Sequence, residues 1–151
     1  MFKIIIATHG EMSTGIKDAL ITIAGVGEDI STLNLISGKN VDDLGKEYLE
    51  ILNDSPADEG VLIFTDLISA SPYNQALLAI NNLEENKKLK VFIVGGVNLP
   101  MVLEAVNHNL LNNDLNDVVE QIASQGKEAI GTWNVADLEN DAEEDDEDDD
   151  F

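Results

Sequence analysis

Three features of the sequence could do chemistry together: a histidine, an aspartate and the start of a helix. His9 ends the apolar run that opens the chain, and Asp66 ends a second apolar run. Ser71 stands directly before Pro72, a pair typical of a helix start, with the serine as the cap and the proline at the first helical position. Helix N-termini hold anions and imidazoles act as nucleophiles. These residue types suit a histidine that accepts a phosphoryl group and passes it on.

The aspartate has a defined task in this chemistry. A carboxylate that accepts a hydrogen bond from the Nδ1–H of His9 would fix the ring tautomer, present Nε2 as the nucleophile and stabilise positive charge on the ring. No serine stands in an obvious triad relationship to a histidine, so the imidazole itself is the expected nucleophile. The sequence contains no arginine, and a phosphate would have to be held by backbone amides, hydroxyl groups or lysines.

The elements that must position these residues follow from the apolar pattern. Three consecutive isoleucines, Ile4 to Ile6, cannot alternate between core and water, so they predict a strand buried on both faces, as in a parallel sheet. Segments of helical spacing separate this strand from similar ones. The predicted strands cover residues 1–10, 30–36, 60–66, 89–97 and a semi-polar 128–135, and the predicted helices cover 13–25, 41–52, 71–84, 101–111 and 115–124.

Alternation of this kind predicts an α/β fold with an open, doubly wound, mostly parallel sheet in the strand order 2-1-3-4. In this order strands one and three are neighbours whose helices leave on opposite sides, and ligands bind beyond the carboxyl ends of the strands at that point. We therefore expect His9 and Asp66 to face each other. The helix that begins at Ser71 should aim its unpaired backbone N–H groups at the same place.

The charge is unevenly distributed along the chain. The net charge is −22, and residues 137–151 hold 11 of the 30 acidic residues and no base, which leaves 19 acidic residues against eight lysines, or −11, for the rest. We predict one domain over residues 1–136 and a disordered acidic tail over 137–151. An acidic body argues against a nucleic-acid or anionic-membrane partner and favours a basic protein partner.

Other classes of site have little support in the sequence. There is no cysteine, so disulfides and thiolate metal sites are excluded. A metal site built from His9, Asp66 and His108 would lack recognisable ligand spacing, and we expect neither a metal nor a cofactor. His108 lies among asparagines near a helix end and is expected to be solvated or capping. The chain opens directly into a predicted strand and no apolar run approaches the length of a membrane span, so we expect a cytoplasmic protein.

Four separated motifs carry a resemblance to a known family. They are Ile-Ala-Thr-His-Gly at residues 6–10, Phe-Thr-Asp at 64–66, Ser-Pro-Tyr-Asn at 71–74 and Gly-Val-Asn-Leu-Pro-Met at 96–101. In order and spacing they resemble the mannose-type (mannose/fructose/sorbose family) enzyme IIA of the bacterial phosphoenolpyruvate-dependent sugar phosphotransferase system, over roughly the first 135 residues.

The resemblance implies roles for single residues. His9 resembles the histidine that is phosphorylated by the phosphocarrier HPr, and Asp66 resembles the aspartate that hydrogen-bonds it. Ser71 and its helix N-terminus resemble the phosphate-stabilising group of the family. Gly10 is expected to stabilise the phosphate with them. The resemblance gives Thr8 and Asn98 supporting positions in the pocket.

The resemblance also implies an assembly. The family forms a homodimer in which the last strand, here 128–135, crosses to the neighbouring subunit and lies antiparallel at the edge of its sheet, where Trp133 would be an apolar anchor. Phosphate passes to a IIB domain and then to a sugar that enters through membrane permease subunits, so the protein would be cytoplasmic and peripheral to the permease complex. Because the sequence ends in the acidic tail, the IIB component is expected to be a separate chain. The sugar cannot be inferred, since the membrane subunits select it.

Two alternatives remain open at this stage. His9 could be a surface histidine that follows a strand and has no function. The same fold could also act as a regulatory phosphohistidine module, such as the phosphotransferase subunit of a dihydroxyacetone kinase or a domain of a transcriptional regulator. The Ser-Pro-Tyr-Asn and Val-Asn-Leu-Pro-Met motifs favour the sugar phosphotransferase.

Overall fold

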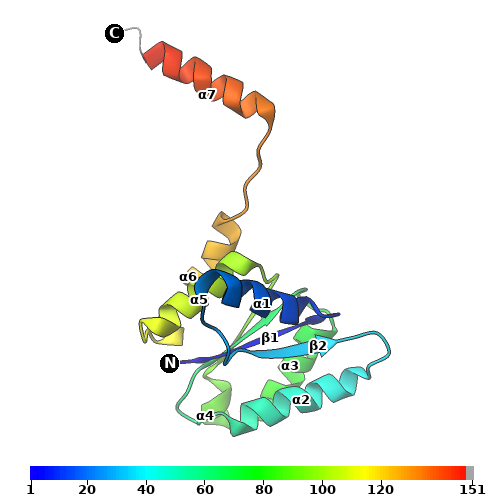
Figure 1. The fold of residues 1–151 in the computed structure, drawn as a ribbon. Helices are drawn as coiled ribbons and strands as arrows, with labels where there is room; N and C mark the ends of the chain where they lie inside the picture. The colour runs from blue at the N-terminus through cyan, green and yellow to red at the C-terminus, as the bar shows by residue number, and fades with distance from the viewer. Residues whose placement is uncertain (149–151) are drawn as a thin grey trace.

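The chain alternates strands and helices from its first residues (Figure 1). The computed structural model describes residues 1–148, and the side chains of residues 1–142. Its elements in order are β1 (Lys3–His9), α1 (Met12–Ala24), β2 (Ser31–Leu35), α2 (Val41–Asp54), β3 (Val61–Thr65), α3 (Ser71–Asn81), α4 (Glu85–Lys88), β4 (Val91–Gly95), α5 (Leu99–Leu110), α6 (Leu115–Glu128) and α7 (Val135–Asp148).

One four-stranded parallel sheet runs through the centre in the order β2-β1-β3-β4, which confirms the predicted topology. β1 lies between β2 and β3, and the helices packed on the two faces of the sheet cover its consecutive isoleucines. At the C-terminal end of β1, His9 pairs in register with Leu35 of β2. Two residues earlier, Ala7 pairs with Thr65, the last residue of β3. The chain segments that follow β1 and β3 therefore leave the sheet side by side.

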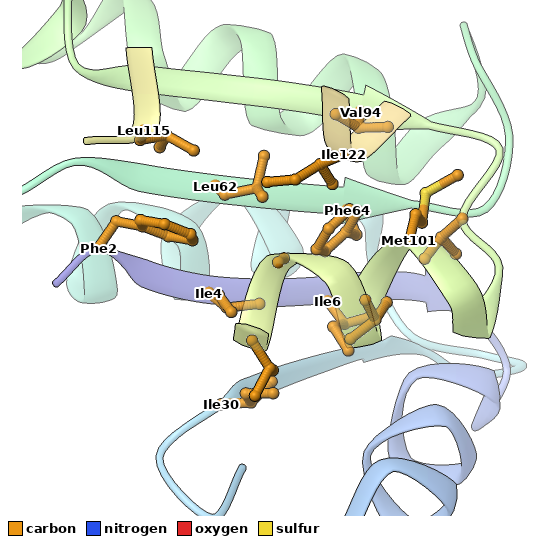
Figure 2. Close-up of a cluster of buried hydrophobic side chains, with 14 of the residues drawn as sticks. Phe2, Ile4, Ile6, Ile30, Leu62, Phe64, Val94, Met101, Leu115 and Ile122 are labelled. Carbon is orange, nitrogen blue, oxygen red and sulfur yellow. The ribbon is translucent and has the colours of Figure 1, made fainter. Parts of the chain in front are cut away.

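The sheet separates two buried clusters of apolar side chains. Ile4 and Ile6 point into the cluster formed with α1, α5 and α6, part of which Figure 2 shows. Ile5 and Ala7 point into the other, formed with α2 and α3. Full burial of one such isoleucine contributes about 1.5–3 kcal/mol. Because side chains alternate along a strand, His9 lies on the same face as Ile5 and Ala7, the face that α2 and α3 cover.

The start of α3 differs from the prediction by one residue. The cap position belongs to Ala70, and Ser71 is the first helical residue, with no capping bond from a side chain. The backbone enters the helix one residue earlier than predicted, directly after Ser69 and Ala70; Ser69 is left-handed, with φ 65°. The N–H of Asn74 already donates to the Ala70 carbonyl at 2.9 Å, which closes the first turn. The predicted capping role of Ser71 is therefore wrong.

The C-terminal region departs furthest from the prediction. The strand expected over residues 128–135 does not form in this chain: Glu128 ends α6, residues 129–134 have no regular structure, and Val135 begins α7. A strand needs a neighbouring edge to pair with, and in this chain the segment meets none. Trp133 is 67% exposed. α7 extends away from the sheet (Figure 1), so 137–148 of the predicted disordered tail is helical, and residues 149–151 lie outside the described residues.

Two smaller features complete the fold. A short helix, α4, was not predicted, and α6 continues four residues beyond its predicted end at Ser124. None of the helices in the described residues is both long enough and apolar enough to cross a membrane.

Candidate functional site

His9 and Asp66 meet at the C-terminal edge of the sheet. The ring Nδ1 of His9 lies 2.7 Å from Asp66 Oδ2, and the backbone N–H of His9 donates to the same oxygen at 3.0 Å. The two residues are 57 positions apart in the sequence and come together because β1 and β3 are neighbours. The His9 side chain is 44% exposed, whereas that of Asp66 is 12% exposed. The structure thus presents an accessible imidazole on a largely covered carboxylate.

The hydrogen bonds of Asp66 define the tautomer of His9. Its second oxygen, Oδ1, accepts the N–H of Leu67 at 3.0 Å. Partial burial acts to raise the pKa of the Asp66 carboxyl, but the bonds from the His9 ring and backbone N–H, the His9 charge and the local backbone bond outweigh it, so the pKa lies below its ordinary value. An ionised carboxylate only accepts hydrogen bonds. Nδ1 of His9 therefore carries the proton, and Nε2 keeps the lone pair.

The N-terminus of α3 lies on the same face of the sheet as His9. In its first turn, Pro72 has no N–H, while the N–H groups of Ser71 and Tyr73 have no carbonyl one turn before them in the helix. Ser71 is half-buried and begins the helix directly after the β3–α3 loop. An anion at the start of α3 would meet these donors and the positive end of the helix dipole.

Tyr48 holds the start of α3 in place, a role that sequence reasoning missed. It lies in the helix predicted over residues 41–52, where it shares the buried, otherwise apolar stripe of α2 with Leu44 and Leu52. It is fully buried, and its hydroxyl donates to the Pro72 carbonyl at 2.9 Å. Burial, and then the charge of Asp66, raise the pKa of Tyr48 far above its ordinary value, so the hydroxyl keeps its proton. A tyrosine in an otherwise apolar stripe was the available signal, because a buried hydroxyl needs a partner.

Gly10 and Thr8, which were also named from the sequence, have structural roles. The N–H of Gly10 donates to the Leu35 carbonyl at 2.9 Å, so it cannot also donate to a phosphate; its φ of 57° makes the turn after β1. Thr8 is fully buried, and its Oγ1 accepts the N–H of Ser13 at 2.8 Å, which fixes the start of α1. The structure uses both residues to hold the His9 turn in shape.

Asn98 joins two helices on the opposite face of the sheet. Its Oδ1 accepts the N–H of Met101 at 3.2 Å and caps α5, and its Nδ2 donates to the Gly126 carbonyl of α6 at 2.9 Å. Both ends of the amide are therefore engaged in packing α5 against α6. The structure does not offer Asn98 as a polar group for the His9 site.

His108 was expected to be solvated or capping, and the expectation of a solvated side chain is wrong. It is buried near the end of α5, where its Nδ1 accepts a hydrogen bond from Asn113 Nδ2 at 2.9 Å and its Nε2 lies 3.1 Å from Glu104 Oε1. The next residue, Asn109, is bonded to the backbone of Phe2 before β1 begins. His108 therefore lies at the opposite edge of the sheet from His9 and cannot share a ligand with it. No group of three potential metal-binding side chains occurs in the described residues.

His9 lies outside the two hollows found near the other ends of the strands. A cavity of about 340 Å³ lies near the N-terminal ends of the strands, lined by residues such as Phe2, Ile30 and Val106. A second hollow is close to it, and neither His9 nor Asp66 lines either one. Small molecules bind in clefts that cover most of their surface. An exposed imidazole outside these hollows is better suited to a reacting group that another protein brings.

Comparison with known proteins places the fold and the site in context. The family model described as "PTS system fructose IIA component" matches residues 3–123. The "PTS system fructose-specific EIIA component" of Bacillus subtilis (strain 168) is 27% identical over 143 residues, covering 89% of this chain and 94% of the relative. The solved structure of phosphotransferase system component EIIA from Streptococcus agalactiae has 29% identity and a TM-score of 0.77, and the match covers 87% of this chain and 97% of that one.

A longer relative matches over the same region. The "PTS system mannose-specific EIIAB component" of Escherichia coli (strain K12) is 24% identical over 127 residues, which cover 84% of this chain and 38% of the relative. The chain thus spans little more than a third of that protein. Because the family model covers most of the chain and the parallel sheet matches a solved EIIA structure, the chain belongs to the EIIA-man family and is a fructose/mannose-type IIA component of the phosphotransferase system.

Proposed function

We propose that His9 is the phosphorylated residue of this IIA component, that it receives its phosphoryl group from HPr and that it passes it to a IIB component during sugar uptake. The observation that carries the proposal is the 2.7 Å contact between His9 Nδ1 and Asp66 Oδ2. It leaves Nε2 as the nucleophilic nitrogen of an exposed ring. Neither the transfer from HPr to His9 nor the transfer from His9 to IIB requires a cofactor or a metal.

The transfer conserves atoms and charge within the two reacting rings. The lone pair of His9 Nε2 attacks the phosphorus of a phosphohistidine on HPr, a P–N bond forms, and the P–N bond to the donor ring breaks and returns its electron pair to that ring. The His9 ring then carries positive charge, and Nδ1–H stays bonded to the Asp66 carboxylate, which stabilises that charge. Such charge-assisted bonds are worth about 1.5–3 kcal/mol. Transfer to IIB repeats the step with His9 as the leaving group.

The phosphoryl oxygens have donors at the start of α3. The free N–H groups of Ser71 and Tyr73, the Ser71 hydroxyl and the helix dipole all favour negative charge there. The left-handed Ser69 adds a concave turn of backbone immediately before the helix. Since the sequence has no arginine, we assign the phosphate to this helix start.

The remaining parts of the proposal concern assembly. The name of the Escherichia coli relative couples an A to a B component, which supports a IIB acceptor for this chain. We propose a cytoplasmic homodimer that meets the membrane permease subunits through IIB. In the dimer, residues 128–135 would pair with the neighbouring sheet, which would cover the exposed Trp133. The division into a domain at 1–136 and a tail at 137–151 stays a prediction.

Labelling with phosphoenolpyruvate tests the proposal directly. The protein is incubated with enzyme I, HPr and radioactive phosphoenolpyruvate, and the expected product carries an acid-labile, base-stable phosphate. His9→Gln should abolish the label. His108→Gln, the matched control at the only other histidine, should retain it once circular dichroism shows that the variant is folded. An unlabelled wild type, or full label on His9→Gln, would contradict the proposal.

The acceptor separates the two candidate roles. Labelled protein is mixed with a mannose-type IIB component or with a dihydroxyacetone kinase, and loss of label from His9 is followed. Transfer to IIB alone is the expected result. Transfer to the kinase alone would place the chain in a regulatory or kinase-linked role instead.

A further inference from the structure

The cavity at the N-terminal edge of the sheet takes no part in the site around His9. Its volume of about 340 Å³ lies at the lower end of the range of small-molecule sites, about 300–1,000 Å³. Its lining comes from the start of β1, the loop between α1 and β2, the end of α2 with the loop after it, and the end of α5. Three helices therefore end at or just before segments that line this cavity.

The least exposed residues of the lining are apolar. Phe2, Ile4 and Ile30 are each 4% exposed, and Figure 2 shows them among the side chains buried on one face of the sheet. Val106 of α5 belongs to the same cluster. Because the core holds these side chains in place, a ligand would meet an apolar surface that is already formed, which lowers the ordering cost of binding.

Three carboxylates line the same cavity, those of Asp29, Asp54 and Glu59. Among the side chains that the structure describes, none of the three forms an ion pair. Asp54 is the last residue of α2, where the helix dipole disfavours a negative charge. The cavity thus combines an apolar surface with acidic groups whose charge no neighbouring base neutralises by direct contact.

Most of the positive groups near the cavity are bonded to other partners. The N-terminal amine of Met1 donates to Asn112 Oδ1 at 2.9 Å. The ammonium groups of Lys17 and Lys87 donate to backbone carbonyls of lining residues, at 2.8 and 2.9 Å. Lys3 lines the cavity as well. The side chains of the lining therefore set three carboxylates against one ammonium group.

We propose that this cavity binds a small organic ammonium ion, whose apolar body lies on Phe2, Ile30 and Val106 and whose charge faces Asp29 and Asp54. The helix ends favour the same charge, since each helix C-terminus carries roughly half a negative elementary charge. An inorganic cation would need several converging oxygen ligands, and no group of three potential metal-binding side chains occurs in the described residues. The proposal does not depend on the phosphoryl transfer proposed for His9.

Three small molecules of similar size test the charge of the ligand. Phenethylammonium has the charge and the apolar body of the proposed class, phenethyl alcohol has the same body without charge, and hydrocinnamate has the opposite charge. Each is titrated into the full chain at neutral pH, and methyl resonances are followed by NMR. We expect phenethylammonium to bind about tenfold more tightly than the alcohol and hydrocinnamate not to bind. The largest shifts should occur at the methyl groups of Ile4, Ile30 and Val106.

A double variant with a matched control tests the carboxylates. Asp29→Asn/Asp54→Asn changes two exposed side chains of the lining, and Asp18→Asn/Asp117→Asn changes two exposed side chains that line neither hollow. The first variant should bind phenethylammonium about tenfold more weakly and the alcohol as before. The control variant should bind both as the wild type does. Val106→Phe, which fills part of the cavity, should weaken the binding of both.

Each other outcome overturns the inference. If millimolar phenethylammonium leaves the methyl resonances of Ile4 and Ile30 in place, the cavity does not bind this class of ligand. Equal affinity for the ammonium ion and the alcohol would make it an apolar cavity without charge selectivity, and tighter binding of hydrocinnamate would reverse its polarity. An equal loss of affinity in the control variant would assign the effect to the net charge of the protein and not to Asp29 and Asp54.

Discussion

The ends of the parallel strands form two edges of the sheet, one C-terminal and one N-terminal, and each holds a histidine beside a carboxylate. The two pairs differ in exposure and in hydrogen bonding. At the C-terminal edge, His9 is 44% exposed and its Nδ1 lies 2.7 Å from Asp66. At the other edge, the His108 side chain is 9% exposed and its Nε2 lies 3.1 Å from Glu104. His108 Nδ1 is also bonded to Asn113. His9 keeps one ring nitrogen toward solvent, whereas both nitrogens of His108 face protein groups.

The contrast shows that a histidine and a carboxylate do not by themselves make a reactive site. His9 combines an exposed ring with a place on the sheet face that carries the start of α3, and the left-handed Ser69 precedes that helix. The pair at the opposite edge joins neighbouring residues of one helix, since Glu104 and His108 are four residues apart on α5. Reactivity depends on which atom of the ring the fold leaves free.

Removing each carboxylate in turn gives the largest difference between the edges. Asp66→Ala should still form phosphohistidine, but about 10–100-fold more slowly, because the ring loses an orienting, charge-assisted bond and keeps its nucleophilic nitrogen. Glu104→Ala should leave the rate within about twofold of the wild type. Single-turnover labelling by phosphorylated HPr measures both. Equal rates for wild type and Asp66→Ala would remove the distinction between the two pairs.

Tyr48, in the buried core, donates a hydrogen bond to the start of α3. Tyr48→Phe removes the hydroxyl that bonds the Pro72 carbonyl, and we expect a loss of about 1 kcal/mol in the free energy of unfolding. Labelling should slow a few-fold, because the start of α3 is less well fixed. Tyr73→Phe is the matched control on α3 itself. Urea unfolding and single-turnover labelling check the pair; a slower rate for Tyr73→Phe than for Tyr48→Phe would contradict this assignment.

Both edges also contain a left-handed residue that is not glycine. Asn112 has φ 57° and Ser69 has φ 65°, and asparagine adopts this conformation more readily than serine. Ser69→Val should lower the free energy of unfolding by about 1–2 kcal/mol, whereas Ser69→Asn should not lower it. Urea unfolding measures both changes. Equal stability of the two variants would mean that the loop carries no strain.

The pH dependence of stability isolates the Asp66 carboxylate. Its pKa is lower in the folded protein than the ordinary value of 3.8, so its contribution is fully present above that value and is lost as the pH falls through the folded-state pKa. Wild type should therefore lose more stability than Asp66→Asn between about pH 6 and pH 3. Urea unfolding at each pH gives the difference. If the free energies of unfolding of the two proteins fell equally with pH, the Asp66 carboxylate would have no stabilising bond in the native state.

Much of the fold could be predicted because it depends on local patterns. Three consecutive isoleucines specify a strand buried on both faces, and the alternation with helices specifies the order of strands. That order alone brought His9 and Asp66 together from distant parts of the sequence.

The details that could not be predicted depend on tertiary contacts. The early entry into α3 comes after a left-handed serine, which no sequence pattern specified. Asn98 follows a strand, as a pocket residue would, yet the position of α6 directs its amide toward Gly126. His108 lies among polar residues and is nevertheless buried by the chain around it. The missing strand over residues 128–135 depends on pairing with another strand, and within this chain the segment pairs with none of the four.

The exposure of His9 also bears on how long a phosphoryl group on its ring would last. Under the proposed function, this exposure of the His9 side chain would let two different proteins reach the same ring nitrogen in succession. Under the same proposal, we expect the phosphorylated fraction of the protein to follow the relative rates at which the donor supplies phosphoryl groups and the acceptor removes them.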